Sequence, residues 1–266
     1  MKEHRRWEKV PNKREPITIN MIQHWHASTK DSPPDSFQSA LLDWSVLGIL
    51  AGFRKSEWIQ DTFEYRKNSD FKRNVDSTVS AFIASDFQLS SVPKSTKVKT
   101  LSTDIPSQLK IRWRFQKNNQ NGQIITFTRN DNNPVFCPVR AAMRILKRAK
   151  RLQVPLDHPL AVFASATDTP IFIHHSLVEK EFRTAATSVY DIRNPSTLKL
   201  FSCHSLRVGA AVLLHANQAD PLYIQFRLRW RSTSFIEYLR NTPRIAALHN
   251  NIINTINTDD TTISQT

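Results

Sequence analysis

The sequence predicts an α+β fold that is mostly helical and contains a small three-stranded antiparallel sheet. Two patterns predict it. Over several segments, apolar residues recur every three to four positions, as they do on amphipathic helices. Two short segments in the first half instead alternate apolar and polar residues on either side of a turn, as in a β-hairpin. The chain has 266 residues, of which 39% are hydrophobic, so it can form one large domain with short appendages.

The first helices are expected near the N-terminus. Thr18 can cap a short helix over 19–26. A longer helix starts near Phe37, carries an apolar stripe and ends at Gly52, and another is expected from Ser56. Pro138, at a first-turn position, opens a helix that runs through Arg151. Later helices are expected near 175–190, 203–216, 220–227, 232–240 and 244–256.

The strands are expected mainly in the first half of the chain. Residues 81–89 have the composition of a strand. In 109–116, Ile111, Trp113 and Phe115 share one face and basic residues the other. Residues 123–129 are β-branched and aromatic, and the intervening KNNQNG predicts the turn of a hairpin. A short buried strand is expected at 160–164.

Positive charge is concentrated in one part of the chain. The net charge is +14, and residues 94–151 contain 14 basic and 2 acidic residues. Aromatic residues are interleaved with these cations. Such a segment is typical of a protein that binds a polyanion, most often nucleic acid, although a solvated basic surface is the alternative. No aromatic RNA-binding motif accompanies it.

The remaining composition narrows the class. Residues 1–16 predict a basic arm, 17–257 one domain and 258–266 a polar tail. The start has no apolar core of a secretory signal, and the two cysteines do not form a disulfide framework, so we expect an intracellular protein that does not associate with membranes. Glycine-rich phosphate-binding motifs are not found.

His204 and Arg207 lie one turn apart at the start of a helix whose other side is apolar. That end of a helix favours an anion, and the forked guanidinium of arginine suits phosphate oxygens. By itself the pair also fits a surface arginine and a hydrogen-bonded histidine. Tyr238 by itself also fits ordinary packing.

Six residues that occur in one particular order favour a phosphate-binding catalytic site over ordinary packing. They are Arg54 in LAGFRKSE, Lys117 in FQKNNQNG, His204 and Arg207 in HSLRVGAA, Trp230 in RLRWRS and Tyr238 in FIEYLR. This order resembles the tyrosine recombinase (phage integrase) family, and the RW-x-S…Y-x-R form is similar to Crypton-type recombinases of eukaryotic mobile elements. The resemblance covers residues 14–245 and implies a catalytic domain of the DNA breaking-rejoining type.

The resemblance implies site-specific recombination or integration of double-stranded DNA. Tyr238 would attack a DNA phosphate, Arg54 and Arg207 would stabilise the transition state, and Lys117 would protonate the departing 5′-oxygen. His204 would bind the phosphate or accept the tyrosine proton, Trp230 would donate its indole N–H, and Glu57 could orient Arg54. We expect further DNA contacts from Lys94, Lys97, Lys99, Arg112, Arg114, Arg129, Arg229 and Arg231.

The resemblance also implies a homodimer or homotetramer on DNA, a nuclear location, and no cofactor. No metal site is expected, since neither His24 and His26 nor His174 and His175 have a matching cysteine or carboxylate pattern. Two departures leave alternatives open. Trp230 precedes Tyr238 by eight residues instead of nine, so Arg229 is the other candidate for that position. The N-terminal core-binding domain of the family is expected to be absent, so a catalytically silent DNA-binding protein is the alternative function.

Overall fold

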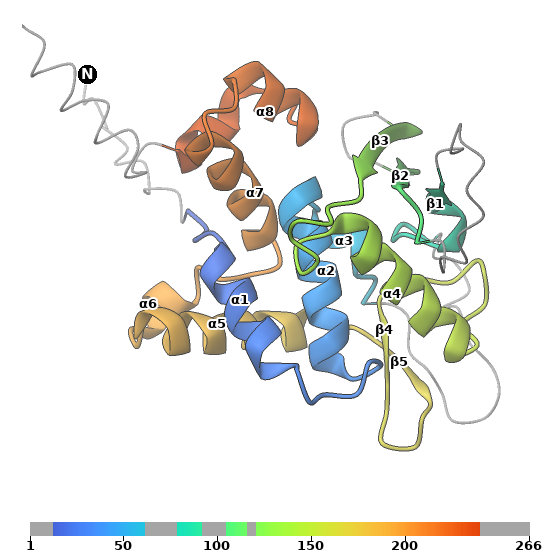
Figure 1. Cartoon of the computed structure of the whole chain (residues 1–266). Coiled ribbons are helices and arrows are strands. Elements are labelled where there is room, and N and C mark those ends of the chain that lie inside the picture. The colour runs from blue at the N-terminus through green and yellow to red at the C-terminus, as the bar shows by residue number, and fades with distance from the viewer. Residues whose placement is uncertain (1–12, 62–78, 92–104, 116–120, 240–266) are drawn as a thin grey trace, which may run out of the picture.

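The computed structural model describes residues 13–61, 79–91, 105–115 and 121–239 (Figure 1). The fold is α+β and mostly helical, as predicted. The helices are α1 (Ile19–Ser28), α2 (Phe37–Ala51), α3 (Lys55–Trp58), α4 (Pro138–Arg151), α5 (His175–Tyr190), α6 (Pro195–Leu198), α7 (Ser205–Ala216) and α8 (Pro221–Arg227), with the 3₁₀ turns η1 (Ala84–Asp86) and η2 (Thr233–Tyr238). The strands are β1 (Phe87–Ser90), β2 (Gln108–Trp113), β3 (Gln123–Thr128), β4 (Val162–Ala164) and β5 (Pro170–Phe172). Within the described part of the chain, no helix is long and apolar enough to cross a membrane.

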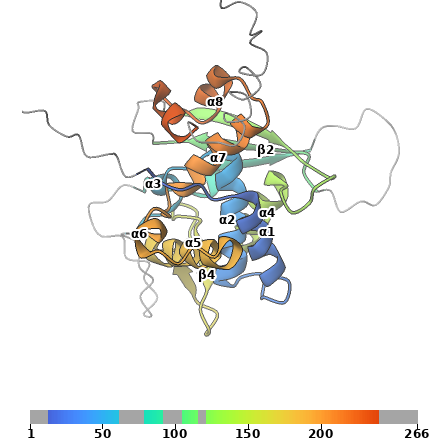
Figure 2. The ribbon, with the colours of Figure 1, turned by 90° about the vertical axis from the view of Figure 1, so that its left-hand side faces the viewer.

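Helix α2 is the centre of the molecule. Figures 1 and 2 place it between α1, α4 and α7, with which it packs. Because these helices surround it, α2 is apolar on nearly all sides, and Trp44 and Leu47 are fully buried. Ser36 caps its first turn, and Gly52 ends it in the left-handed conformation (φ 63°), as predicted. The carbonyl groups at this end of α2 accept hydrogen bonds from side chains of the candidate site.

The three-stranded sheet has the order β1-β2-β3 and is antiparallel throughout. The predicted hairpin is confirmed, with Trp113 opposite Gln123 and Ile111 opposite both Phe87 and Ile125. The alternation holds for Ile111 and Trp113, which are buried. Phe115 was expected on the same face but lies beyond the end of β2 and is 47% exposed.

Other expectations need correction. The strand expected at 81–89 begins only at Phe87, because the Asp86 side chain accepts the Ile83 N–H over 2.9 Å and turns the chain beforehand. Strand β5, which pairs with β4 in a separate hairpin, was not predicted because it is short and begins at Pro170, a residue that argues against a strand. The last predicted helix of the described part, 232–240, is the 3₁₀ turn η2, and its Ile236 is 41% exposed. The helix expected at 244–256 lies outside the described residues.

The segment that precedes α1 packs against α7 and the residues just before it. The Glu15 N–H donates to the Leu200 carbonyl over 3.3 Å, and the Ile17 N–H to the Ser205 carbonyl over 3.0 Å. The Ile17 carbonyl oxygen lies 2.2 Å from the position that a Cβ on residue 209 would occupy. Only glycine allows this approach, so Gly209 lets the N-terminal segment lie against the start of α7.

Candidate active site

The C-terminal end of α2 brings together side chains from distant segments. Gly52 ends the helix, so the last carbonyl groups have no partner within the helix and carry the negative end of its dipole. Guanidinium groups bind them. Arg207 Nη1 donates to the Gly52 carbonyl over 2.7 Å, and Arg229 Nη1 donates to the Ala51 carbonyl over 2.9 Å.

Arg229 has a structural role. Its side chain is completely buried, with Nη2 3.0 Å from Oε2 of Glu57 and the guanidinium carbon 4.0 Å from the centre of the Trp113 ring. The predicted DNA contact of Arg229 is therefore wrong, because its charge is neutralised inside the protein. The next residue, Trp230, faces the other candidate residues, with its ring centre 6.4 Å from that of His204 and 6.1 Å from that of Tyr238. Of the two neighbours, Trp230 is thus the one that lies beside His204 and Tyr238, and its catalytic role stays a prediction.

Arg54 and Arg207 are held side by side. The Nη2 atom of each donates to the carbonyl oxygen of Arg229 over 3.2 Å. Glu57 orients Arg54, with Oε1 3.1 Å from Arg54 Nη1. Burial, and then the charges of Arg54 and Arg229, lower the pKa of Arg207 well below its ordinary value. A bound anion would relieve this repulsion, and Arg54, whose side chain is 20% exposed, would meet it first.

His204 and Tyr238 face each other at the edge of this cluster. His204 stands directly before α7 and Tyr238 ends η2, and their Nε2 and Oη atoms are 3.5 Å apart. Burial, followed by the charge of Arg207, lowers the pKa of His204 to about 4. Burial raises the pKa of Tyr238, which Arg14 and Arg207 lower in turn. At neutral pH the imidazole is neutral, so its Nε2 can accept the phenol proton when Nδ1 carries the ring hydrogen.

The ring of Trp230 packs on Arg207, whose guanidinium carbon is 4.5 Å from the ring centre. The indole Nε1 is buried and has no hydrogen-bond partner. Donation of this N–H to a phosphate therefore stays a prediction. In the structure the ring instead positions Arg207 and borders Tyr238.

Among the described residues predicted to contact DNA, Arg112 and Arg231 are exposed, although Arg112 Nη2 also lies 3.5 Å from Asp86 Oδ1. Arg114 and Arg129 are largely engaged within the protein. Arg114 donates to the Asp86 carboxylate and to two backbone carbonyls, and Arg129 donates to the Asp131 carboxylate and to the Ile105 carbonyl. The remaining candidates lie outside the described residues: Lys94, Lys97, Lys99 and Lys117.

Arg14, which belongs to the predicted basic arm, was not among the predicted site residues. Arg14 Nη1 donates to the Lys199 carbonyl over 2.9 Å. Its positive charge lowers the pKa of both His204 and Tyr238, so it lies close enough to act on both. The basic composition of residues 1–16 was the only signal in the sequence. No periodicity links Arg14 to α7, because the contact depends on the tertiary fold.

One group of side chains has the donor atoms of a metal site. Asp61 brings a carboxylate to His174 and His175, with the donor atoms within 4.8 Å of one another, so the expectation that the histidines lack a carboxylate partner was wrong. However, Lys55 Nζ lies 3.0 Å from Asp61 Oδ2. Burial raises the pKa of Asp61, but hydrogen bonds from the His175 backbone and from Lys55 outweigh it and bring the value to about 2. The ammonium group thus already neutralises the carboxylate that a cation would need.

No protein-family model matches the sequence, and no curated protein matches it either. Among solved structures, the fold is similar to that of the XerH site-specific recombinase bound to its difH substrate in a pre-cleavage complex, with a TM-score of 0.49 and 12% identity over 92% of this chain and 55% of that chain. It is also similar to the Tn1549 transposon integrase in complex with transposon right end DNA, with a TM-score of 0.46 and 14% identity over 93% of this chain and 68% of that chain. The chain spans about half the length of the XerH chain.

Proposed function

We propose that this protein breaks and rejoins DNA strands through Tyr238, as a site-specific recombinase or integrase. The observation that carries the proposal is the 3.5 Å approach of Tyr238 Oη to His204 Nε2 beside Arg54 and Arg207. Attack on a phosphodiester needs a hydroxyl nucleophile, a proton acceptor and donors that stabilise negative charge on the phosphate oxygens. These four side chains offer all three.

In the proposed reaction, Tyr238 Oη attacks the phosphorus and its proton passes to His204 Nε2. The bond to the 5′-oxygen breaks, and Lys117 supplies the proton that this oxygen takes up. Arg54 and Arg207 neutralise the charge that develops on the non-bridging oxygens. The products are a 3′-phosphotyrosine and a free 5′-hydroxyl, and joining is the reverse reaction. The ester conserves the energy of the broken bond, so the scheme requires no cofactor.

The second candidate function is DNA binding without cleavage. It is favoured by the low pKa of His204, about 4, together with the raised pKa of Tyr238. Both shifts oppose proton transfer from the phenol to the imidazole as long as no phosphate occupies the site. In a catalytically silent protein the same cations would bind DNA, and Tyr238 would only pack against neighbouring side chains.

Covalent trapping separates the two functions. The protein is mixed with nicked DNA duplexes of random sequence, from which the cleaved strand diffuses away, and adducts are separated on a denaturing gel. We expect an adduct with the wild type and with Tyr223→Phe, an exposed tyrosine of α8, but not with Tyr238→Phe. A wild type that forms no adduct while it binds DNA establishes the silent function. An adduct that persists in Tyr238→Phe refutes the assigned nucleophile.

Assembly as a homodimer or homotetramer on DNA is part of the proposal. It is supported by large apolar side chains exposed on α8 and β3, with exposed fractions of 74% for Leu222, 71% for Phe226 and 56% for Ile124. The mobile-element origin, the Crypton-type relationship and the nuclear location rest on the sequence resemblance alone and stay predictions.

A further inference from the structure

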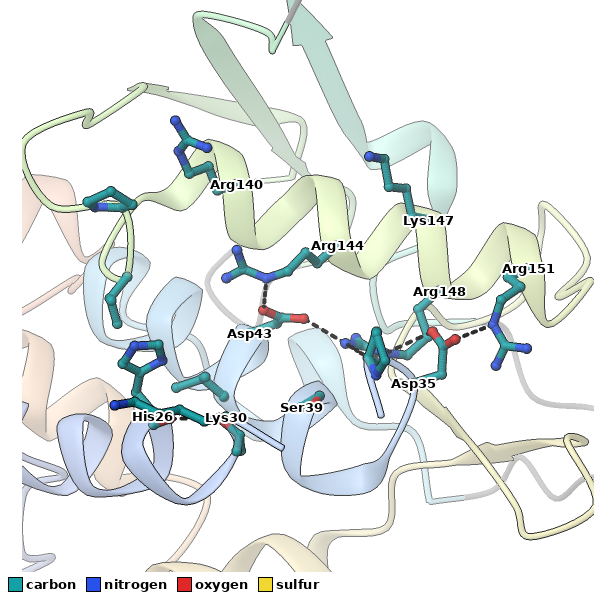
Figure 3. Close-up of a pocket in the computed structure, with 15 residues that line it drawn as sticks. His26, Lys30, Asp35, Ser39, Asp43, Arg140, Arg144, Lys147, Arg148 and Arg151 are labelled. Carbon is teal, nitrogen blue, oxygen red and sulfur yellow. Dashed lines mark hydrogen bonds and ion pairs between the residues drawn. The ribbon is translucent and has the colours of Figure 1, made fainter. Parts of the chain in front are cut away.

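A cavity of about 780 Å³ lies between α4 and the segment that joins α1 to α2 (Figure 3). None of the candidate catalytic residues that the structure describes lines it. A ligand site in this cavity therefore does not depend on the proposed DNA cleavage.

One wall of the cavity is a row of cations on α4. Arg140, Arg144, Lys147, Arg148 and Arg151 follow one another at helical spacing and so share one face (Figure 3). Like charges three and four residues apart destabilise a helix. The helix dipole favours cations only in the last turn and does not explain those further upstream. The row is therefore expected to have an anionic partner.

The carboxylates in the cavity do not balance this row. Asp43 accepts from Arg144 over 2.6 Å and from Arg148 over 2.7 Å, and Asp35 pairs with Arg148 and Arg151. Each carboxylate thus already serves two guanidinium groups. Across the described lining, six lysines and arginines face these two acids, and two further acids outside the lining pair with its ends, Asp131 with Arg140 and Asp168 with Arg151. Lys30 and Lys147 form no ion pair with a described residue, so positive charge remains in excess.

Arg148 is built into the cavity wall with an unused donor. Its side chain is only 2% exposed, and Nε and Nη2 both donate to the Pro34 carbonyl, over 3.2 and 2.8 Å. Its Nη1 is buried and has no hydrogen-bond partner. A buried charged donor without an acceptor is costly, and an oxygen atom of a ligand in the cavity would satisfy it.

We infer that this cavity binds a compact polyphosphate, such as a free nucleotide or inorganic tripolyphosphate. Phosphate groups joined in a short chain match cations that are packed within a few helical turns. The apolar lining residues Leu42, Pro134 and Val135 can accept the uncharged part of a nucleotide. The volume lies in the range of small-molecule sites. A DNA duplex carries its phosphates on a convex surface and does not enter such a recess.

The test is calorimetric titration of the whole protein with tripolyphosphate and, separately, with ATP. We expect binding to the wild type and at least tenfold weaker binding to Lys147→Glu. The Lys147 side chain is exposed and forms no ion pair with a described residue, so the substitution should not disturb the fold. The matched control is Lys180→Glu, the same change of charge at an exposed position of α5, which should stay within twofold of the wild type. Tripolyphosphate should also raise the Tm of the wild type and of the control, but not that of Lys147→Glu.

Several results would overturn the inference. Equal weakening by both substitutions would show a general effect of net charge. If the titration of the wild type gives no binding heat and tripolyphosphate does not raise its Tm, the cavity does not bind polyphosphate. Binding of poly-glutamate or duplex DNA that depends on Lys147, without binding of tripolyphosphate, would assign the cavity to an acidic protein or to DNA instead.

Discussion

Arg54 and Arg207 donate hydrogen bonds to the same backbone carbonyl, that of Arg229, each over 3.2 Å. The spacing of the two candidate phosphate-binding groups therefore depends on the main chain at a residue whose own side chain is buried. Arg229 has a left-handed backbone (φ 58°), and its guanidinium is tied to Glu57 and to the end of α2. The stability of this buried pair and the geometry of the site are thus linked.

Arg229→Ala should destabilise the protein strongly. It leaves the Glu57 carboxylate buried without its Arg229 partner and removes the contact with the Trp113 ring. Breaking a buried ion pair costs about 3–5 kcal/mol. Urea unfolding followed by tryptophan fluorescence measures the change. The control Arg231→Ala, at an exposed position, should change the free energy of unfolding by less than about 0.5 kcal/mol. Similar small effects of both substitutions would contradict the structural role of Arg229.

His204 should make stability depend on pH. Its pKa is about 4 in the folded protein against about 6.5 in an unfolded chain, so between these values the unfolded state binds more protons. The contribution is complete above pH 6.5, falls as the pH is lowered and levels off below pH 4. At pH 4.5 the wild type should have lost about 2 kcal/mol more than His204→Gln, relative to pH 7. Urea unfolding of both proteins at both pH values measures this, and parallel losses would refute the depressed pKa.

Arg14→Ala should slow covalent adduct formation about tenfold, as expected when one charge near a transition state is removed. Stability should change little, because the side chain is exposed and makes one described hydrogen bond. Arg14→Lys should restore most of the rate. Because Arg14 lowers the pKa of Tyr238, the rate profile of Arg14→Ala should also shift to higher pH. An unchanged profile together with a lower rate would assign Arg14 a purely structural role.

Arg112 in β2 and Arg114, which follows the strand, should differ in their effect on DNA binding. Arg112→Ala should weaken DNA binding and reduce the slope of log affinity against log salt by about one, since one phosphate contact is lost. Arg114→Ala should mainly lower stability, because Arg114 holds the loop before β1 through Asp86 and backbone carbonyls. Fluorescence anisotropy over a range of salt concentrations and urea unfolding separate the two effects. An unchanged salt slope in Arg112→Ala would remove Arg112 from the DNA interface.

The elements that the sequence predicted well are those with strong local patterns. The helix that Gly52 ends and the helix that Pro138 opens were placed correctly, and so was the hairpin around Trp113, because caps, turns and periodicity are local properties. Strand β5 and the 3₁₀ turn η2 were not recognised. The first is short and begins at a proline, and the second differs from an α-helix mainly in its hydrogen bonds.

The sequence by itself determined the α+β class and the order of the residues that form the candidate site. It could not distinguish Arg229 from Trp230, two neighbouring residues that are equally plausible by spacing. Tertiary structure placed them differently, because the carbonyls at the end of α2 and the Glu57 carboxylate bind the Arg229 side chain in the interior. It also placed Arg14 and the α4 cations, since contacts between residues far apart in the chain leave no local pattern.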